Sequence, residues 1–281
     1  MNKTNLPQKA YENSEFINSV NARPLRILAE FLEPEYRFKK NNIVDTIVFF
    51  GSARLRSLKE AKKLLKEFKK THNVNSRNYK KRLKELQTLV KNSRYYEDAV
   101  KLSEKLTNWS MHLPTNEEKR FIICSGGGPG IMEAANKGAK KAGGYSIGLN
   151  ISIPYEQFVN KYVKKELAFE FHYFFMRKFW FAYLAKALII FPGGFGTLDE
   201  FMEILTLIQT GKIKKEMKVI IYDKNYWNNI INFQALLDNG MINKKDLKLV
   251  DFCSSVDEMF EKIIAHFEKF YLHKNGNKKT G

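Results

Sequence analysis

Three short segments rich in glycine and other small residues could bind an anion. They are residues 51–54 (Gly-Ser-Ala-Arg), 125–130 (Ser-Gly-Gly-Gly-Pro-Gly) and 192–197 (Pro-Gly-Gly-Phe-Gly-Thr). Each follows an apolar run of strand length, so in a parallel sheet all three would reach the same edge. Backbone N–H groups in such turns, and at the start of the helix that follows, are free to bind a phosphate. Three converging turns predict a phosphate site more strongly than any one of them.

None of the three segments matches a familiar nucleotide motif. The dinucleotide fingerprint G-x-G-x-x-G would need its last glycine at Ile131, Glu133 or Asp199, and Asn150 stands where the acidic ribose ligand is expected. The P-loop is excluded because Gly211-Lys212 lacks the following Ser or Thr and the upstream glycine spacing. The sequence therefore predicts a phosphate site that belongs to neither class.

The third segment is followed by acidic residues that could do chemistry. Thr197 is placed to cap the next helix and to offer its hydroxyl to a phosphate, and Asp199 and Glu200 then fall in the first turn. The helix dipole would favour an ionised carboxylate there. We interpret Glu200 as an anion that accepts a proton or faces a developing cation, and Asp199 as a helix-starting residue.

Residues 192–200, Pro-Gly-Gly-Phe-Gly-Thr-Leu-Asp-Glu, fit the pattern P-G-G-x-G-T-x-x-E. This run resembles the signature of the LOG (Lonely guy) family, the nucleoside 5′-monophosphate phosphoribohydrolases often labelled lysine decarboxylases. Met176-Arg177-Lys178 resembles the arginine–lysine pair of the family, and residues 125–139 resemble its first glycine loop and helix. The likeness extends over residues 43–267, apart from a basic insertion.

The resemblance implies hydrolysis of the N-glycosidic bond of a nucleotide to free base and ribose 5-phosphate, with no metal or organic cofactor. It implies Arg177 and Glu200 as the catalytic residues. It implies a substrate-binding set of Gly51, Ser52, Gly127, Gly128, Gly130, Glu133, Lys178, Pro192, Gly193, Gly194, Gly196 and Thr197. The chemistry fits, because cleavage builds positive charge on the ribose, which an anionic Glu200 can stabilise, and negative charge on the base, which Arg177 can offset.

The chain also departs from the short plant-type pattern. Phe174-Phe175-Met176 replaces the His-Glu-rich residues before the arginine, and an N-terminal extension and an insertion are added. A general purine or pyrimidine nucleosidase is therefore as compatible with the sequence as an enzyme for cytokinin nucleotides. The alternative is a non-catalytic nucleotide-binding sensor or carrier with the same fold. Family members are dimers or larger, so the resemblance implies a homodimer or higher homo-oligomer.

Apolar runs of strand length recur between helix-length amphipathic stretches. They are residues 46–50, 121–124, 146–149, 187–191 and 218–222, with 247–252 as a weaker sixth. Continuous apolar character is typical of strands covered on both faces. The sequence predicts an α/β fold: a doubly wound, mainly parallel Rossmann-like sheet with helices on both faces.

Domain boundaries follow from this pattern. Residues 1–42 form a helical extension with Pro24 in its first turn and Pro34 at its end, residues 43–272 form the nucleotide-binding domain, and residues 273–281 form a polar tail. A helix follows Ser255, with Glu258 completing a capping box. We interpret Lys186 as lying in a helix before a strand, and His172 as a strand residue.

The chain of 281 residues carries a net charge of +18, and much of it lies in one insertion. Residues 56–105 contain 16 Lys and Arg against 6 Asp and Glu, a surplus of ten, with apolar residues at helical spacing. We expect two or three solvated helices there. Nucleic acid is an unlikely partner, although Tyr79, Tyr95 and Tyr96 could stack on bases.

The composition also restricts the location of the protein. The apolar content of 44% is too high for a disordered chain, and no apolar run approaches the roughly 20 residues that span a bilayer. Cys124 and Cys253 match no metal or redox spacing. They indicate buried thiols in a reducing compartment, so we expect a cytoplasmic protein without a membrane segment.

Overall fold

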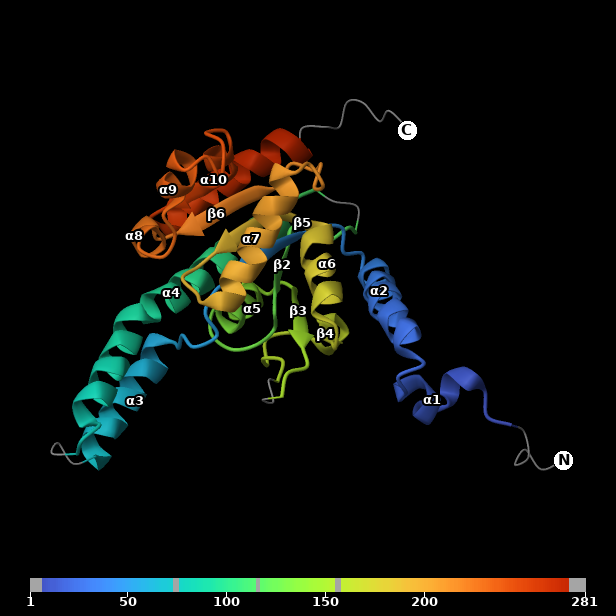
Figure 1. The fold of residues 1–281 in the computed structure, drawn as a ribbon, viewed down its shortest axis with the longest axis horizontal. Helices are drawn as coiled ribbons and strands as arrows, with labels where there is room; N and C mark the ends of the chain where they lie inside the picture. The colour runs from blue at the N-terminus through green and yellow to red at the C-terminus, as the bar shows by residue number, and fades with distance from the viewer. Residues whose placement is uncertain (1–6, 73–75, 115–116, 155–157, 273–281) are drawn as a thin grey trace.

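The computed structural model describes residues 7–72, 76–114, 117–154 and 158–272. Its centre is a seven-stranded sheet in which every neighbouring pair of strands is parallel (Figure 1). The strands are β1 Thr46–Phe50, β2 Ile122–Ser125, β3 Ser146–Ile151, β4 Ala168–Phe171, β5 Ala185–Ile190, β6 Lys218–Tyr222 and β7 Asp251–Cys253. The predicted doubly wound α/β fold is confirmed.

The strand order β4-β3-β2-β1-β5-β6-β7 places a reversal beside β1. The chain first adds β2, β3 and β4 on one side of β1, and then returns to pair β5 with its other side, in a register that includes Phe50 opposite Ile190. In open α/β sheets ligands bind at the carboxyl ends of the strands where the order reverses. The segments after β1 and β5, residues 51–54 and 192–197, lie at that point.

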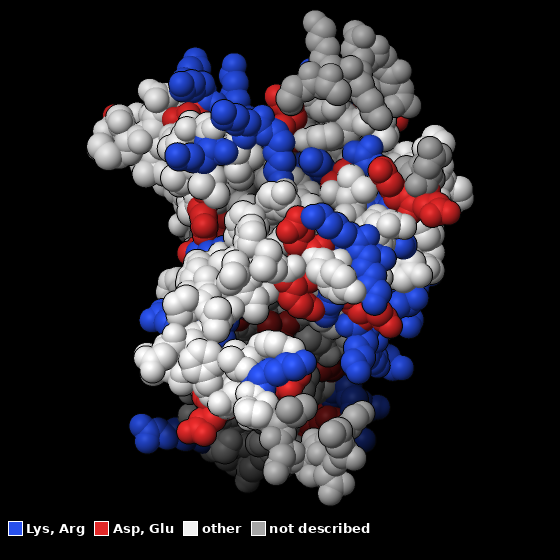
Figure 2. Space-filling view, turned by 90° about the vertical axis from the view of Figure 1, so that its right-hand side faces the viewer, with Lys and Arg blue, Asp and Glu red and all other residues white. Residues whose placement is uncertain are grey.

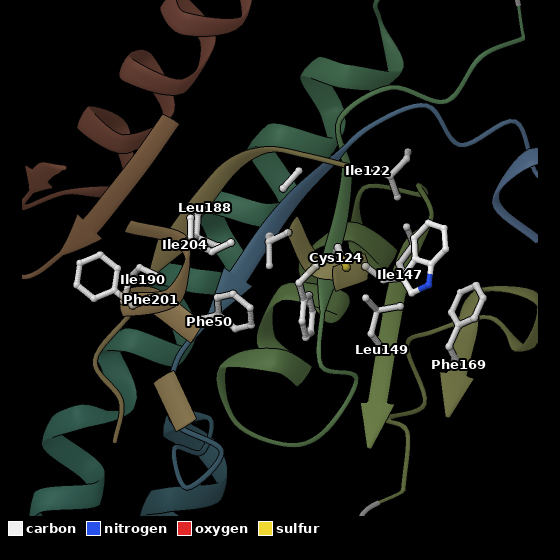
Figure 3. Close-up of a cluster of buried hydrophobic side chains, with 14 of the residues drawn as sticks. Phe50, Ile122, Cys124, Ile147, Leu149, Phe169, Leu188, Ile190, Phe201 and Ile204 are labelled. Atoms are coloured by element: carbon white, nitrogen blue, oxygen red, sulfur yellow. The ribbon is translucent and has the colours of Figure 1, made fainter. Parts of the chain in front are cut away.

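Helices cover both faces of the sheet, as the continuous apolar strands require. One face is covered by α2 Arg23–Lys40, α6 Phe174–Leu184 and α7 Phe195–Gln209, and the other by α4 Tyr79–Met111, α5 Ile131–Lys141 and α10 Val256–Phe267. Shorter helices are α1 Ser14–Asn18, α8 Lys224–Asn228 and α9 Phe233–Asp238. Figure 3 shows the core on the first of these faces, which includes Phe50, Cys124 and Leu188 of the sheet and Phe201 of α7.

Three sequence predictions about this sheet were wrong in detail. The edge strand β4 was not among the predicted strands because it alternates, with Phe169 and Phe171 buried and Glu170 exposed. The last strand begins at Asp251, since a short 3-10 helix occupies Asp246–Leu249. Lys186 lies on β5 rather than in a helix, because α6 ends at Leu184 and runs directly into that strand.

Pro34 was predicted to end the N-terminal helix, but it lies inside α2. The helix continues because Phe38, one turn further on, is buried against the rings of Phe169 and Trp180, at centroid distances of 4.9 and 5.4 Å. Proline has no N–H to donate to the carbonyl of Glu30. Trp180 Nε1 donates to that carbonyl instead, at 3.0 Å. Tertiary contacts therefore outweigh the local cost of the proline.

The basic segment forms two helices, α3 Leu58–Thr71 and the long α4. Figure 1 shows α3 and the first half of α4 side by side, pointing away from the sheet. The second half of α4 packs on the sheet, where Ala99, Leu102 and Leu106 are fully buried. Tyr95 and Tyr96 are buried as well, so neither ring is available to stack on a nucleic-acid base.

The surface combines basic groups with apolar areas. On the side of the molecule that carries α2, uncharged side chains separate groups of Lys and Arg (Figure 2). Leu25, Leu28 and Leu32 of α2 are each about half exposed. Within the described ranges, none of the helices has the length and apolar character to cross a membrane.

Candidate active site

A cavity of about 790 Å³ opens at the carboxyl edge of the sheet, between the ends of β1 and β5. Its walls come from the segments after these two strands, from Gly126 after β2, and from side chains of α4, α6, α7 and α8. The strand order therefore places the cavity where a doubly wound sheet binds its ligand.

Backbone hydrogen bonds join the three glycine segments. Ser52 N–H donates to the Pro192 carbonyl at 3.0 Å, and Ile131 N–H donates to the Ser52 carbonyl at 3.1 Å. Gly130 has a φ of +71°, and a Cβ there would lie 2.2 Å from the Ser52 carbonyl oxygen. Only glycine permits this close approach. The structure thus brings together the segments that the sequence singled out.

The helix after the third segment begins earlier than predicted. The N-cap of α7 is Gly194, and Leu198 N–H donates to the Gly194 carbonyl at 3.0 Å. Thr197 is therefore the third helical residue rather than the cap, and neither Asp199 nor Glu200 lies in the first turn. The backbone N–H groups of the first turn have no partner inside a helix, so those at Phe195, Gly196 and Thr197 can serve a ligand.

Glu200 is a buried carboxylate on the cavity wall. It is 5% exposed, and its Oε1 lies 3.3 Å from Nη2 of Arg177. Burial raises the pKa of Glu200 to about 7, although Arg177 and Lys178 act in the opposite direction. The expectation of a carboxylate held ionised by the helix dipole was wrong, because the dipole acts within the first turn and Glu200 lies in the second.

Arg177 reaches the same cavity from α6. Its guanidinium lies over the rings of Phe174 and Phe181, at 5.2 and 5.6 Å from their centroids. Burial lowers its pKa, against the charge of Glu200. In the part of the chain that the structure describes, its buried Nε has no hydrogen-bond partner.

The predicted substrate-binding residues fall into two groups. Gly51, Ser52, Pro192, Gly193, Gly194, Gly196 and Thr197 line the cavity together with Arg177 and Glu200. Gly127, Gly128, Gly130, Glu133 and Lys178 are not among the lining residues. Lys178 instead bridges α6 to α7 through Asp199 at 2.8 Å and Glu203 at 2.7 Å.

The remaining members of the second group support the loops. Glu133 accepts a hydrogen bond from the Tyr96 hydroxyl at 2.7 Å. Asn160 Nδ2 donates to the carbonyls of Gly127 and Gly128, at 2.8 and 3.1 Å. The Asn160 contacts stabilise the turn of the second glycine segment, and the Tyr96 contact joins α4 to the helix α5 that follows this segment.

Several cavity residues were missed by sequence reasoning, which treated the basic insertion as unrelated to the site. Asn92 and Tyr95 of α4 and Tyr226 of α8 line the cavity. The Tyr226 hydroxyl donates to the Gly193 carbonyl at 2.7 Å and so supports the third glycine segment. The adjacent tyrosines 95 and 96 in a basic stretch were the only sequence signal, and it did not reveal the direction of their side chains.

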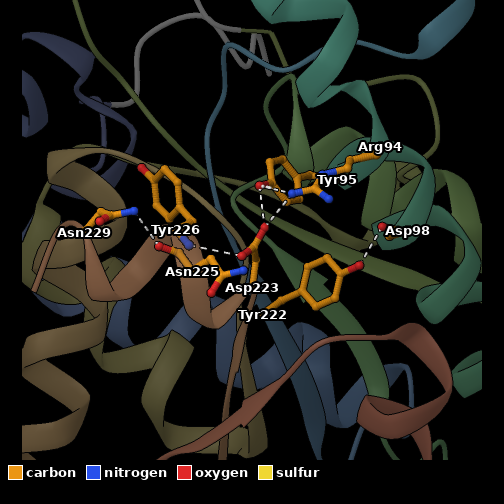
Figure 4. A network of polar contacts seen from close by, with 8 residues as sticks. All are labelled: Arg94, Tyr95, Asp98, Tyr222, Asp223, Asn225, Tyr226 and Asn229. Carbon is orange, nitrogen blue, oxygen red and sulfur yellow. Dashed lines mark hydrogen bonds and ion pairs between the residues drawn. The ribbon is translucent and has the colours of Figure 1, made fainter.

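Asp223 connects two of these missed residues, Tyr95 and Tyr226 (Figure 4). Its carboxylate accepts from the Tyr95 hydroxyl at 2.7 Å, from Arg94 Nη2 at 2.6 Å and from Tyr226 N–H at 3.0 Å. Its φ of +68° is in the left-handed region, which a non-glycine residue adopts only where the surroundings hold it. The network joins α4 to the end of β6 and fixes two walls of the cavity.

Metal ligands are absent from the described residues: no group of three or more His, Cys, Asp or Glu there is placed to hold an ion. Cys124 and Cys253 are buried and unpaired, and burial raises the pKa of Cys253 to about 11.

Comparisons with known proteins agree with the motifs. Residues 132–263 match a family model described as "Possible lysine decarboxylase". The cytokinin riboside 5′-monophosphate phosphoribohydrolases LOG7 and LOG3 of Arabidopsis thaliana are each 24% identical to this chain. LOG7 aligns over 179 residues, which are 63% of this chain and 76% of that protein, and LOG3 over 176 residues, which are 62% and 76%.

Two solved structures are also similar to this chain. The molybdenum cofactor binding protein of Rippkaea orientalis is 22% identical with a TM-score of 0.43, over 61% of this chain and 86% of that one. The Moco carrier protein of Chlamydomonas reinhardtii is 17% identical with a TM-score of 0.45, over 80% and 99%.

The family model, the curated relatives and the motif at residues 192–200 all point to one family. The resemblance of this chain to the LOG family, predicted from the sequence, is confirmed.

Proposed function

We propose that this protein hydrolyses the N-glycosidic bond of a nucleoside 5′-monophosphate, releasing the free base and ribose 5-phosphate. The observation that carries the proposal is the buried pair of Arg177 and Glu200, 3.3 Å apart, on the wall of a cavity that the glycine segments also line. The names of the curated relatives support the same reaction.

The start of α7 suits the 5′-phosphate. The free N–H groups of its first turn and the helix dipole both favour an anion there. Thr197 and Glu200 are three residues apart and both line the cavity, so they share one face of the helix. A phosphate bound beside Thr197 therefore places the ribose of the same nucleotide beside Glu200.

The reaction breaks the bond between C1′ and the base nitrogen and forms a bond from C1′ to a water oxygen. The electron pair of the broken bond leaves with the base, so the ribose becomes cationic in the transition state. The Glu200 carboxylate stabilises that cation and accepts the proton that water loses. The departing base nitrogen takes up a proton from solvent, and Glu200 returns its proton to solvent, so the products are the free base and ribose 5-phosphate. The Arg177 guanidinium offsets the negative charge that develops on the base, or holds the phosphate.

The experiment is an assay of ribose 5-phosphate release from a panel of nucleoside monophosphates. The panel contains purine, pyrimidine and cytokinin nucleotides, because the motifs do not select a base. We expect release from at least one of them and its loss in Glu200→Gln. Glu203→Gln is the matched control, since Glu203 lies one turn further along α7 and pairs with Lys178.

The assay also distinguishes the proposed hydrolase from the alternative, a non-catalytic nucleotide-binding protein. A wild-type protein that binds a nucleotide tightly by calorimetry, yet releases no ribose 5-phosphate from any member of the panel, would be a nucleotide sensor or carrier. Loss of release in Glu203→Gln as well as in Glu200→Gln would contradict the specific role proposed for Glu200.

We further propose that the protein is a homodimer, as the family resemblance implies. Leu25, Leu28 and Leu32 of α2 and Phe175 of α6 are exposed, and the rings of Phe31 and Phe179 join the two helices at 5.4 Å. An apolar area that spans two packed helices is typical of an interface. We expect a dimer by light scattering and a monomer for the double variant Leu28→Glu, Leu32→Glu; a monomeric wild type would overturn the proposal.

A further inference from the structure

We propose that Glu30, in the N-terminal helix α2, is a positioning residue that holds α6 so that Arg177 faces Glu200. The structural part of this inference stands on contacts within the chain, and its importance for turnover rests on the proposed function. Glu30 lies 147 positions before Arg177, in the N-terminal extension that the short plant-type pattern lacks.

The Glu30 carboxylate caps the start of α6. Its two oxygens accept hydrogen bonds from the backbone N–H groups of His172 at 2.7 Å and Tyr173 at 3.2 Å. Tyr173 is the N-cap of α6 and its own side chain makes no capping bond. A carboxylate at a helix N-terminus satisfies free N–H groups and interacts favourably with the helix dipole. Glu30 therefore fixes, from another helix, the two residues that lead into α6.

The backbone of Glu30 holds α6 a second time. Because Pro34 has no N–H, the Glu30 carbonyl lacks its ordinary helical partner, and Trp180 Nε1 donates to it at 3.0 Å. Trp180 is 3% exposed, so its indole is fixed by packing as well as by this bond. One residue of α2 thus contacts both the residues just before α6 and the middle of that helix.

A short path of hydrogen bonds leads from Glu30 to Arg177. Tyr173 donates its N–H to Glu30 and accepts, through its carbonyl, the N–H of Arg177 at 3.2 Å. Arg177 Nη2 then lies 3.3 Å from Glu200 Oε1. Without the Glu30 carboxylate the first turn of α6 can fray, and Arg177 can move away from Glu200.

The titration of Glu200 reports this displacement without any substrate. Burial raises the pKa of Glu200 most, Arg177 and Lys178 of α6 lower it, and Asp199 and Glu203 of α7 raise it further. If α6 shifts while Glu200 stays buried, the two cations withdraw and the two carboxylates of α7 stay, so the pKa of Glu200 rises. Loss of the charge of Glu30 by itself would lower that pKa, so the sign of the change separates displacement from a direct effect of charge.

The experiment follows the Glu200 carboxyl signal by carbon-13 NMR in protein with labelled glutamate, and Glu200→Gln assigns the signal. We expect Glu30→Ala to raise the apparent pKa of Glu200 by about one pH unit, the size that one neighbouring opposite charge gives. Glu35→Ala is the matched control, because Glu35 lies on the same helix and pairs with Lys39 at the surface. It removes the same charge and should not raise the pKa.

Two further variants keep the test decisive if Glu30→Ala does not fold. Glu30→Gln retains one acceptor oxygen, and Trp180→Phe removes the indole donor while keeping an aromatic ring. Each should shift the Glu200 titration upward by less than the alanine change. An unchanged or lowered titration of Glu200 in the folded variants would overturn the positioning role.

Turnover is measured separately. In a variant of Glu30 we expect kcat to fall about tenfold with a smaller change in KM, because a misplaced catalytic group slows the chemical step. A wild type without activity would remove the proposed function and leave the titration result standing. A normal kcat together with a raised pKa of Glu200 would show that Glu30 positions α6 but does not limit the reaction.

Discussion

Arg177 Nη2 and Glu200 Oε1 lie 3.3 Å apart, and the two residues come from α6 and α7, the helices that precede and follow β5 in the chain. Burial lowers the pKa of Arg177 and raises the pKa of Glu200, so each charge is disfavoured by the same removal from water. A buried pair of this kind adds little stability by comparison with apolar residues. Its position on the cavity wall fits the chemical role proposed for it.

Activity should depend on pH through Glu200. The proposed chemistry needs the carboxylate, and burial raises the pKa of Glu200 to about 7. The value of kcat/KM should therefore rise with pH through about 7 and level off above it. A pH–rate profile on the preferred nucleotide checks this, with the pKa of the substrate phosphate measured alongside. A rate that falls as pH rises through 7 would mean that Glu200 acts as an acid instead.

Replacing Glu200 by glutamine should stabilise the protein at alkaline pH. The folded-state pKa of Glu200, about 7, lies above its ordinary value of 4.5, so the folded state keeps a proton that the unfolded state releases between these pH values. Stability thus falls as pH rises through this window, by up to about 3 kcal/mol above pH 7.

Glutamine at position 200 stays neutral at every pH, so the Glu200→Gln variant does not lose this part of its folding stability as the pH rises. Thermal unfolding should show a higher Tm for Glu200→Gln than for wild type at about pH 8, and a smaller difference at about pH 5. Glu203→Gln, which removes a half-exposed carboxylate one turn further along the same helix, should show a much smaller dependence. Equal differences in Tm at the two pH values would contradict the raised pKa of Glu200.

Two glycines of the third segment should respond differently to alanine. A Cβ at Gly193 would lie 2.1 Å from Thr197 Oγ1, whereas a Cβ at Gly196 would meet nothing within 4 Å. Gly193→Ala should therefore lower the stability by about 1–3 kcal/mol. Gly196→Ala should leave the stability unchanged or raise it slightly. Denaturant unfolding of both variants measures this, and equal losses would show that the contact with Thr197 does not restrict residue 193.

The Tyr226 hydroxyl should matter for binding. It donates to the Gly193 carbonyl at 2.7 Å, so Tyr226→Phe leaves that carbonyl without this donor and loosens the third glycine segment. We expect a loss of about 1 kcal/mol in stability and a higher KM with little change in kcat. Tyr183→Phe is the control, since Tyr183 is 54% exposed on α6. A KM equal to that of wild type would contradict the supporting role of Tyr226.

Much of the fold followed from local patterns. The continuous apolar runs at Thr46–Phe50 and Lys218–Tyr222 were placed with their observed bounds, because strands buried on both faces need such runs. The capping pair of Ser255 and Glu258 marked the start of α10, where Ser255 Oγ accepts Glu258 N–H at 3.1 Å. The alternating edge strand β4 and the proline inside α2 did not follow, since the burial of neighbours decides both.

For the site, the sequence by itself predicted the resemblance to the LOG family, the glycine segments, and Arg177 and Glu200 as candidate catalytic residues, because phosphate binding and charge stabilisation need those residue types in a short motif. Only the tertiary structure decided that Glu200 is buried with a raised pKa, that Tyr95 and Tyr226 complete the cavity, and that Glu30 caps α6. The physical reason is separation along the chain. Burial and hydrogen bonds between residues more than a hundred positions apart depend on how strands and helices pack, and no local spacing encodes that packing.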